Sequence, residues 1–563
     1  MTHDTRLQDL CDDGTDVLIL GAGINGAGLF RDLAEQGLRV LIVEKGDYGG
    51  GTSAAPSRMI HGGLKYLETG EFRLVSQSTL ERNLLLRNAP HAVTPLPTLI
   101  PIFSWTKGVW AALRTLFGST TAARSRGALL LKVGLSIYDH YGSRANVMPR
   151  HKMKSRAKTL AEFPQMTPRI VASGLYYDAK IAGPERLVWE LLADGMEANP
   201  KALALNYTQI TAHSGAEISF TREDGTTFTT RPKLVINAAG PWIDRVNAAL
   251  GAETKLIGGT KGSHILLDHP DLLKMLNGQM IYFEADDGRI LLVYDYLGKA
   301  LVGSTDIKAA DPENVRCEDD EIAYFLTSLR ALLPGLRFDH THIIYAYSGI
   351  RPLPASNAAT PGLISRDHSA PVLEATAQRP YPIIALVGGK WTTFRGFAEE
   401  VADTCLARLN HPRRISTRNL GIGGGKAYPT DDAGKSRLIA SAAASGGLNL
   451  ARAQQLFTRY GTSLTSLVAH QSPYSDAIRL PHATDYSAAE IDWIARSEQV
   501  EHLSDIVLRR NTLAVTGALN TADLNQIADI IASAKAWTPE RRATEITHLT
   551  AQLAHINRQT LTQ

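Results

Sequence analysis

The chain has 563 residues, of which 44% are hydrophobic and 20% are charged. This composition is typical of a globular protein and excludes a collagen, a coiled coil and a wholly disordered chain. Its 59 lysines and arginines nearly balance its 56 aspartates and glutamates, so the charge gives no reason to expect a nucleic-acid partner. The length predicts about two to four domains.

The cysteines and the N-terminus indicate a reduced protein that is not exported. Cys11, Cys317 and Cys405 are far apart and form no CxxC motif or Cys/His cluster, so we expect neither disulfides nor structural zinc. The first residues are polar and acidic, which is not the pattern of a signal peptide. No apolar run is long enough to span a membrane, and any membrane contact is therefore expected to be peripheral.

A strand, a glycine turn and a helix follow the polar start. An apolar strand is predicted over residues 16–20, and a glycine-rich turn follows it over residues 21–28. Helical spacing then runs over residues 29–37, and a second strand over 38–43 ends at Glu44. This order and spacing are those of a dinucleotide-binding βαβ unit.

Each part of the unit has a role in holding a dinucleotide. Gly21 permits the tight turn, Gly23 lets the backbone approach a pyrophosphate, and Gly26 lets the helix pack closely on the strand. The N-terminus of the helix offers N–H groups and a positive dipole end to the phosphates. Glu44 can accept hydrogen bonds from a ribose, which favours FAD or NAD over NADP.

Three later segments favour FAD over NAD. Each reads as a buried strand that ends in a small-residue or polar turn; they span residues 231–242, 301–307 and 381–390. Spread along the chain, they describe a nucleotide-binding sheet that a large substrate domain interrupts. The nucleotide domain of an NAD dehydrogenase is usually one contiguous stretch.

Residues 51–68 read Gly-Thr-Ser-Ala-Ala-Pro-Ser-Arg-Met-Ile-His-Gly-Gly-Leu-Lys-Tyr-Leu-Glu. They resemble the signature of the FAD-dependent (aerobic, respiratory) glycerol-3-phosphate dehydrogenase family. Further segments similar to that family occur along nearly the whole chain, at residues 71–75, 81–82, 89–91, 138–140, 261–264, 303–306, 347–352, 388–393 and 503–512.

The resemblance implies an α/β fold with a Rossmann-like FAD-binding domain, interleaved with an antiparallel-sheet substrate domain, and a C-terminal all-helical domain. The interleaved part is expected over 14–410, with its FAD-binding portions at about 14–90, 168–260 and 345–410. A Gly- and Pro-rich linker is expected over 411–435, and the helical domain over 436–563.

In that family sn-glycerol 3-phosphate is oxidised to dihydroxyacetone phosphate, and the electrons pass from flavin to a membrane quinone. Oxidising a secondary alcohol needs a hydride acceptor, a base for the hydroxyl proton and cations for the phosphate. His61 is the predicted base, because imidazole titrates near neutral pH. Arg351 is predicted to bind the phosphate through its guanidinium fork, and Lys390 to face flavin or phosphate. The alternative for His61 is a structural loop histidine, and for Arg351 and Lys390 it is a cation on the surface without a role in the site.

The remaining predicted contacts follow from the resemblance. Lys65, Tyr66 and Lys261 are expected to join Arg351 in binding substrate, and no metal site is predicted. The residues expected to contact FAD are Gly21, Gly23, Gly26, Glu44, Lys45, Thr52, Ser53, Ala239, Gly240, Asp306, Gly389, Lys390 and Thr392.

Two departures from the family pattern leave the substrate and acceptor open. Position 65 is Lys where the family commonly has Arg, and residues 54–56 are Ala-Ala-Pro where the family is usually Ser-rich. At position 65 the point charge of a lysine ammonium replaces the forked guanidinium of an arginine, so the geometry of phosphate binding is less restricted. A longer polyol phosphate such as erythritol phosphate is therefore an alternative substrate. Three further alternatives are an oxygen-using oxidase, an amino-acid oxidase and a non-enzymatic flavin-binding module. An amino-acid oxidase would not need several phosphate cations, and the presence of His61, Arg351 and Lys390 argues against the non-enzymatic module.

Residues 101–137 contain five basic residues and no acidic one, with Trp105 and Trp110 among them. Aromatic and basic residues in alternation are typical of an interfacial amphipathic helix, and tryptophan favours the headgroup boundary. We therefore expect contact with a membrane surface. The expected location is the cytoplasmic face of the inner membrane, or the cytoplasm if this segment is an ordinary buried helix pair. A homodimer is left open.

Overall fold

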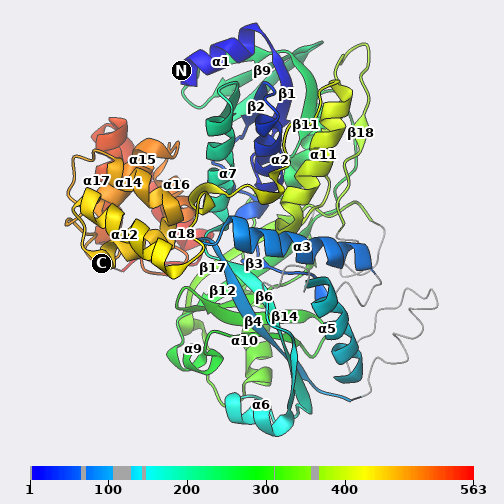
Figure 1. The fold of residues 1–563 in the computed structure, drawn as a ribbon, viewed down its shortest axis with the longest axis vertical. Helices are drawn as coiled ribbons and strands as arrows, with labels where there is room; N and C mark the ends of the chain where they lie inside the picture. The colour runs from blue at the N-terminus through cyan, green and yellow to red at the C-terminus, as the bar shows by residue number, and fades with distance from the viewer. Residues whose placement is uncertain are drawn as a thin grey trace.

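The computed structural model describes residues 3–64, 71–105, 128–142, 148–309, 311–356 and 367–562. Two β-sheets lie one above the other in Figure 1, and a group of C-terminal helices packs at their side. Lys65, Tyr66, Trp110 and most of the predicted membrane-contacting segment lie outside the described residues. Among the helices that are described, none is long and apolar enough to cross a membrane.

The upper sheet has six strands in the order β18-β19-β11-β1-β2-β7, and all neighbours are parallel except β18 and β19. Its strands are nearly continuous apolar runs, as expected for a parallel sheet buried on both faces. They are β1 (Thr15–Leu20), β2 (Val40–Val43), β7 (Ala202–Leu205), β11 (Pro232–Asn237), β18 (Val372–Leu373) and β19 (Ile383–Ala385).

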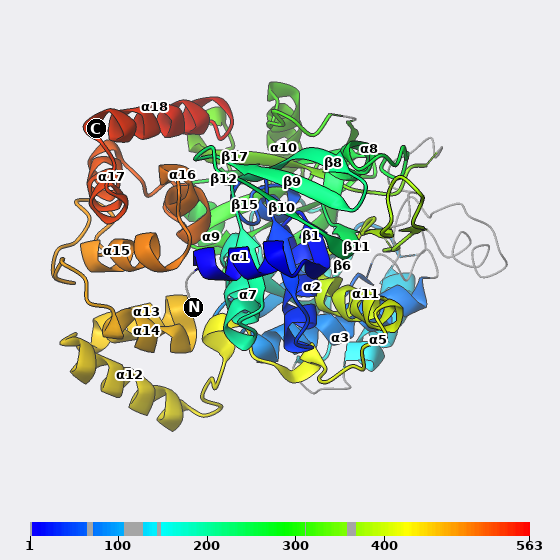
Figure 2. The same ribbon diagram turned by 90° about the horizontal axis from the view of Figure 1, so that it is seen from above.

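Helices cover one face of this sheet and a small antiparallel sheet covers the other, as Figure 2 shows from above. The helices are α2 (Ile24–Glu35), α7 (Pro184–Ala198) and α11 (Phe394–Arg408). The small sheet consists of β8 (Thr208–Ser214), β9 (Glu217–Arg222) and β10 (Thr227–Thr230), with α1 (His3–Asp12) beside it and α8 (Ile243–Ala249) after β11.

The lower sheet has the order β16-β12-β15-β14-β13-β4-β6-β3, with β17 also paired to β12 and β5 to β6. Its strands are β3 (Met59–Ile60), β4 (Val93–Ile102), β5 (Lys152–Ser155), β6 (Ala172–Ile181), β12 (Thr260–Leu267), β13 (Met280–Glu284), β14 (Ile290–Tyr296), β15 (Lys299–Gly303), β16 (Ile307–Lys308) and β17 (Ile343–Arg351). All pairings are antiparallel except that of β13 with β4.

Helices from the middle of the chain pack on this second sheet. They are α3 (Phe72–Asn88), α5 (Ala128–Gly142), α6 (Arg156–Glu162), α9 (Pro270–Leu276) and α10 (Asp319–Leu332). Short 3₁₀ turns join the elements at η1 (Thr52–Ala54), η4 (Gly240–Trp242), η5 (His340–His342), η7 (Trp391–Thr393), η8 (Thr417–Asn419) and η9 (Gly423–Gly425).

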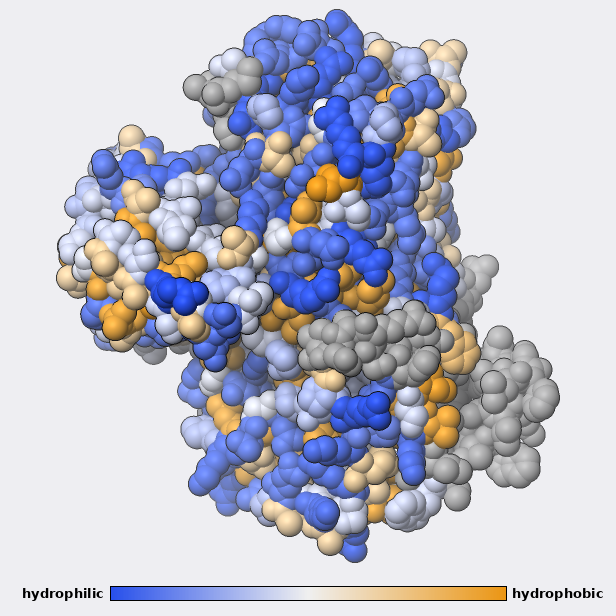
Figure 3. All heavy atoms as spheres, viewed as in Figure 1, coloured by the Kyte–Doolittle hydropathy of each residue, from blue (hydrophilic) through white to orange (hydrophobic). Residues whose placement is uncertain are grey.

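The C-terminal region is helical and shares a hydrophobic core with Tyr296, Tyr345 and Tyr347 of the lower sheet. Its elements are α12 (Asp432–Gly446), α13 (Leu450–Tyr460), η10 (Gly461–Ser463), α14 (Leu464–Ala469), α15 (Ala488–Ser497), α16 (Leu503–Asp505), the π-helical turn η11 (Ile506–Arg510), α17 (Thr521–Lys535) and α18 (Pro539–His555). On the face shown in Figure 3, hydrophobic side chains lie scattered among hydrophilic ones.

The predicted fold class is confirmed, because a parallel nucleotide-type sheet, a largely antiparallel second sheet and a C-terminal helical region are all present. The chain crosses between the sheets at other positions than the predicted ranges give, since β6 and the strand β17 up to Arg351 belong to the lower sheet. Helix α12 starts before position 436, because the Asp431 side chain accepts the Gly434 N–H and caps it.

Candidate active site

The glycine turn between β1 and α2 has space only where a dinucleotide needs it. A Cβ at Gly26 would lie 2.0 Å from the Gly21 oxygen, and one at Gly21, where φ is +103°, would lie 2.7 Å from the Ala238 oxygen. An added Cβ at Gly23, by contrast, would meet no backbone atom within 4 Å, and its one neighbour is the end of the Ser53 side chain, with Oγ at 3.1 Å. The turn is therefore closed on its packing side and open at the helix N-terminus.

Glu44 binds the glycine turn through one carboxylate oxygen and the loop after β2 through the other. Its Oε2 accepts the Ala22 N–H at 2.8 Å, and its Oε1 accepts the Gly46 N–H at 3.1 Å. Burial raises the pKa of this carboxyl, and these two backbone bonds oppose the rise. Glu44 thus lies against the turn at the carboxyl end of β2.

Three other predicted cofactor positions, Lys45, Ala239 and Gly240, lie at the same end of the sheet. The Lys45 ammonium lies 4.0 Å from the centre of the Trp242 ring. Ala239 directly follows the carboxyl end of β11, and Gly240 turns with φ +55° into η4. An added Cβ at Gly240 meets no atom within 4 Å, so this surface of the turn is open.

The turn η1 connects three distant segments. Ser53 Oγ accepts the Ile24 N–H at the start of α2, at 2.9 Å, and Ser53 O accepts the Trp391 indole N–H at 3.2 Å. Thr52 Oγ1 donates to the Ile350 oxygen at 2.5 Å. The structure therefore brings residues 52 and 53 together with the α2 N-terminus, with β17 and with η7.

His61 follows β3, and its backbone is held on both sides. The His61 N–H donates to Thr392 Oγ1 at 3.2 Å. The next amide, Gly62 N–H, is directed at Asp178 Oδ1 at 2.9 Å and at the Tyr138 hydroxyl at 3.0 Å. Any side chain at position 62 would overlap that hydroxyl, because a Cβ would lie 2.2 Å from it.

A buried charge network supports this loop. Arg82 of α3 donates through NH1 to the Tyr138 hydroxyl at 2.8 Å, to Asp178 at 3.1 Å and to the Tyr177 oxygen at 3.0 Å. Burial alone would lower the pKa of Arg82, but Tyr138 and Asp178 outweigh burial and raise the pKa. The network thus fixes the peptide next to His61 with charge-assisted hydrogen bonds.

Arg351, at the end of β17, is oriented by the turn that follows β15. Its NH1 donates to Asp306 at 3.1 Å, and its NH2 donates to Ser304 Oγ and the Thr305 oxygen, each at 3.0 Å. The guanidinium crosses Gly262, where a Cβ would lie 2.1 Å from NH2. Asp306 is therefore the ion-pair partner of Arg351.

Lys261 lies on the opposite face of β12 from Gly262, because successive residues of a strand face opposite sides. Its Nζ is 2.7 Å from Glu321 of α10 and 3.2 Å from the Arg316 oxygen. Ser263, on the same face, also donates to Glu321, at 2.7 Å. The structure does not bring Lys261 together with Arg351.

The paired glycines after β19 lie against the start of α2. The Asn25 amide donates to the Gly388 oxygen at 3.4 Å, and a Cβ at Gly389, where φ is +88°, would lie 2.7 Å from the Asn25 amide nitrogen. Lys390 follows them with a buried Nζ, and Thr392 is the acceptor for His61. Segment 388–392 therefore joins the site from a third strand.

His264 is a site residue to which the sequence assigned no role. Its Nε2 is 2.8 Å from Ser57 Oγ, and its ring stacks on Tyr347 with 4.8 Å between centres. It lies over Gly303, and burial, together with Arg351, lowers its pKa well below the usual value. The resemblance of residues 261–264 to the family indicated this region of the sequence. It did not show which side of the sheet the His264 ring lies on, because that depends on the pairing of β12 with β15 and β17.

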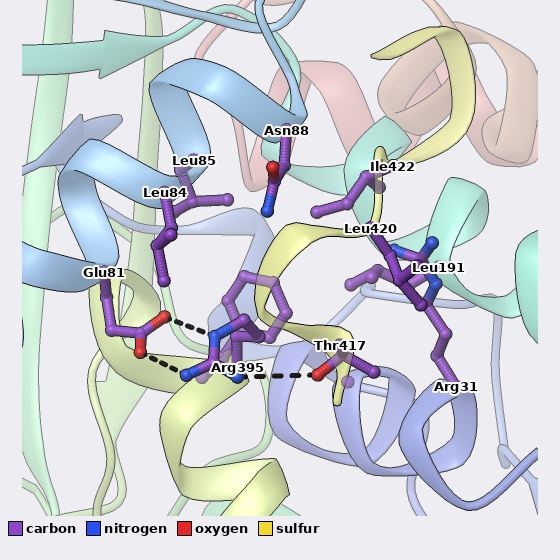
Figure 4. A pocket seen from close by; sticks show the side chains of 12 residues that line it. Arg31, Glu81, Leu84, Leu85, Asn88, Leu191, Arg395, Thr417, Leu420 and Ile422 are labelled. Carbon is purple, nitrogen blue, oxygen red and sulfur yellow. Dashed lines mark hydrogen bonds and ion pairs between the residues drawn. The ribbon is translucent and has the colours of Figure 1, made fainter. Parts of the chain in front are cut away.

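A small cavity behind α2 is a separate feature. It has a volume of about 20 Å³ and lies between α2, α3, α11 and residues 417–422. At its edge Arg395 forms an ion pair with Glu81 at 2.6 Å and reaches Thr417 at 3.5 Å (Figure 4). A space of this size holds about one water molecule, so it is not a cofactor or substrate site.

Comparison with known proteins places the chain in a family. Residues 16–404 match the model of the FAD dependent oxidoreductases, and residues 415–542 match that of the C-terminal domain of alpha-glycerophosphate oxidase. A glycerol-3-phosphate dehydrogenase from Synechocystis is 31% identical over 553 residues, which is 93% of this chain and 94% of that protein. The chain belongs to the FAD-dependent glycerol-3-phosphate dehydrogenase family.

Two further similarities bear on fold and substrate. The chain resembles the crystal structure of a glycerol-3-phosphate dehydrogenase from Bacillus halodurans complexed with FAD, with a TM-score of 0.74, 21% identity and coverage of 98% and 97% of the two chains. A D-erythritol 1-phosphate dehydrogenase from Brucella abortus is 32% identical over 407 residues, 70% of this chain and 74% of that protein. The family and its FAD cofactor are thus as the sequence predicted, and the protein is an FAD-dependent oxidoreductase.

Proposed function

We propose that the protein oxidises sn-glycerol 3-phosphate to dihydroxyacetone phosphate and passes the electrons to a membrane quinone. The observation that supports this proposal most is that three segments meet at the N-terminus of α2. Ser53 Oγ accepts a hydrogen bond from the Ile24 N–H, and Ser53 O accepts one from the Trp391 indole. Thr392 Oγ1 accepts a hydrogen bond from the His61 N–H. A histidine is thereby fixed next to the end of the nucleotide-binding turn.

The residues around the turn fit FAD. The open space above Gly240 and the absence of a side chain at Gly23 suit a close approach of phosphates to the backbone, and Glu44 is placed to meet the adenosine ribose. We assign Lys45, Thr52, Ser53, Ala239, Gly389 and Thr392 to the surrounding shell. When bound, FAD supplies the acceptor for the hydride that leaves the alcohol carbon.

The chain's own residues supply the acid–base chemistry and the charge. His61 takes the proton of the C2 hydroxyl, and the bonds at its own and the following amide hold its position. Arg351 and Lys390 provide positive charge for the phosphate. Since NH1 and NH2 of Arg351 already donate to protein acceptors, Arg351 acts as an oriented cation rather than as a fork that closes on the phosphate.

Lys65 and Tyr66 are assigned to the substrate by resemblance, and Lys261 is reassigned. Its ion pair with Glu321 supports a structural role between β12 and α10. Asp306, which the sequence placed next to FAD, is proposed to orient Arg351.

A second substrate is favoured by one observation. The D-erythritol 1-phosphate dehydrogenase is as similar to this chain as the glycerol-3-phosphate dehydrogenase from Synechocystis, although over a shorter stretch. Together with Lys at position 65, this supports a related four-carbon polyol phosphate as the alternative substrate.

Peripheral contact with the cytoplasmic face of the inner membrane is proposed from the end of β4. The Trp105 side chain there is 61% exposed, and Phe103 is 39% exposed. Indole rings favour the membrane interface, and the basic residues that follow in the sequence favour anionic lipid.

A titration of the flavin spectrum tests the proposed substrate. Under anaerobic conditions the purified holoenzyme is mixed with sn-glycerol 3-phosphate, with D-erythritol phosphate and with an amino acid. We expect the flavin absorbance to bleach with one of the polyol phosphates and to be unchanged by the amino acid. Reoxidation by a short-chain quinone, but not by dissolved oxygen, supports the dehydrogenase; rapid reoxidation by oxygen alone would support the oxidase instead.

A further inference from the structure

The loop that follows Glu44 is held from outside by the C-terminal helical domain. Asp47 in this loop is fully buried and accepts hydrogen bonds from Arg510 NH1 and NH2, both at 2.9 Å, and from Arg509 Nε at 2.5 Å. Tyr48, the next residue, donates to Gln499 Oε1 at 2.5 Å. The contact of Asp47 with Arg510 joins positions 463 residues apart in the chain.

The same loop is bonded on its other side to the glycine turn. Ala22 donates its N–H to Glu44 at 2.8 Å, and its oxygen accepts the Gly49 N–H at 3.0 Å. Both bonds lie between Gly21 and Gly23. A short loop with hydrogen bonds on both sides therefore connects the nucleotide turn to Arg509 and Arg510.

The two arginines reach one carboxylate from an unusual helical turn. They end η11, a π-helical turn, and such turns are rare and frequent at functional sites. In a regular α-helix successive side chains diverge by about 100°. Arg509 also binds Asp505 at 2.6 Å, and Arg510 Nε lies 3.7 Å from Glu498.

The charges in this contact are arranged to fix geometry rather than to add stability. Burial favours the neutral form of Asp47, yet Arg510 and Arg509 outweigh it and lower the pKa of the carboxyl, so Asp47 is ionised. Burying such ions costs most of what their attraction returns. Apolar side chains would attach the domain equally well, but they would not set the direction of the loop.

We infer that Arg509 and Arg510 are positioning residues for FAD, which hold the loop after Glu44 in the conformation that binds the adenosine end. The C-terminal helical domain is then a part of the cofactor site. The inference rests on the proposed placement of the ribose at Glu44. Because coupling between two events is reciprocal, FAD must strengthen the docking of this domain by the factor by which docking strengthens FAD binding.

FAD titration of the full-length apoprotein, followed by flavin fluorescence, tests the inference. Arg510→Gln is expected to raise the Kd of FAD by about tenfold or more, and Arg510→Lys is expected to restore part of the loss. The matched control is Arg452→Gln, which removes an equally buried arginine from Asp476 and Glu490 within the same domain. The control is expected to lose stability and to keep the parental Kd.

The result that overturns the inference is a Kd for Arg510→Gln equal to that of the parent, or equal to that of Arg452→Gln. If Arg510→Gln does not fold, Asp47→Asn decides in the same way, because it keeps the shape of the side chain and removes its charge. A Glu44→Ala variant distinguishes a failure of the proposed ribose placement at Glu44 from a failure of the inference about Arg509 and Arg510. If it binds FAD as tightly as the parent, the placement of the ribose fails, whatever the arginine variants do.

Discussion

The proposed cofactor site and the proposed substrate site of this molecule are shaped by different parts of the chain, the first by the backbone and the second by side chains. At the glycine turn the shape comes from the backbone: Gly21 and Gly26 leave no room for a Cβ, and Glu44 binds two amide N–H groups. At the substrate end the shape comes from charged side chains that cross between strands, such as Arg351 with Asp306. A backbone site depends on local residue spacing, whereas a side-chain site exists only after the strands have paired.

The largest effect, on both stability and FAD content, is expected from adding a methyl group at Gly26 in the glycine turn. Gly26→Ala places a Cβ 2.0 Å from the Gly21 oxygen, so α2 must move away from β1, at a cost of about 3 kcal/mol in the free energy of unfolding. The protein should purify without FAD. Gly134→Ala in α5 is the control, because its Cβ meets nothing within 4 Å; equal FAD content and stability in the two variants would refute this account of the turn.

A methyl group added at Gly262, beside Arg351, is expected to lower catalytic activity rather than stability or FAD content. Gly262→Ala brings a Cβ to 2.1 Å from Arg351 NH2 and displaces the guanidinium, which is a flexible side-chain end. We expect kcat/KM for the polyol phosphate to fall by about 10²-fold, while FAD content and melting temperature stay near those of the parent. Steady-state kinetics with the Gly134→Ala variant in parallel provide the check, and an unchanged kcat/KM would remove Arg351 from the substrate site.

A smaller effect is expected beneath His61. Tyr138→Phe removes one of the two acceptors that the Gly62 amide faces and leaves Asp178 in place. Stability should fall by about 1 kcal/mol, and kcat should fall less than in Gly262→Ala. Tyr460→Phe is the matched control, since its buried hydroxyl also donates to a carboxylate, Glu490, at 2.5 Å. If both variants lower kcat alike, the hydroxyl has no specific role at His61.

The smallest effect is a dependence of stability on pH. Contacts between titratable side chains, such as those of His502, can produce it, whereas backbone packing cannot. His502 bonds Glu545 at 2.8 Å and Glu223 at 2.7 Å, and against the effect of burial these carboxylates raise its pKa from 6.5 to about 9. Because the folded pKa is the higher one, the contribution is complete below pH 6.5 and disappears as the pH rises through about 9.

The contribution of this histidine is expected to be about 1 kcal/mol at most, since part of the cluster is exposed. Urea unfolding of the parent and of His502→Gln at pH 6.5 and above pH 9 measures it. The two proteins should differ at the lower pH and converge at the higher one. A difference that grows with pH would contradict the assignment of a raised pKa.

The contrast between the two ends also explains what the sequence could and could not predict. The spacing of Gly21, Gly23, Gly26 and Glu44 was sufficient for the dinucleotide unit, and two of the three later segments join β1 in the parallel sheet as β11 and β19. The prediction for the third segment, 301–307, was wrong, because it lies in β15 and β16 of the lower antiparallel sheet. Such features are local, so their chemistry is readable from residues close together in the chain.

The side-chain networks were not readable in this way. Whether Lys261 or His264 faces Arg351 depends on the pairing of β12 with β15 and β17, which no local pattern specifies. The contact of Asp47 with Arg510 joins the first and last parts of the chain. Resemblance to the family supplied His61 and Arg351 as candidates, but it could not supply the partners that orient them.

The most direct test of the proposed reaction is the rate at which substrate reduces the bound flavin in a single turnover. Stopped-flow mixing of anaerobic holoenzyme with sn-glycerol 3-phosphate is compared for the parent and for His61→Ala. The variant should retain FAD and should reduce it about 10² to 10⁴ times more slowly, with partial recovery at higher pH as hydroxide replaces the base. A variant that is reduced as fast as the parent would show that His61 is not the base.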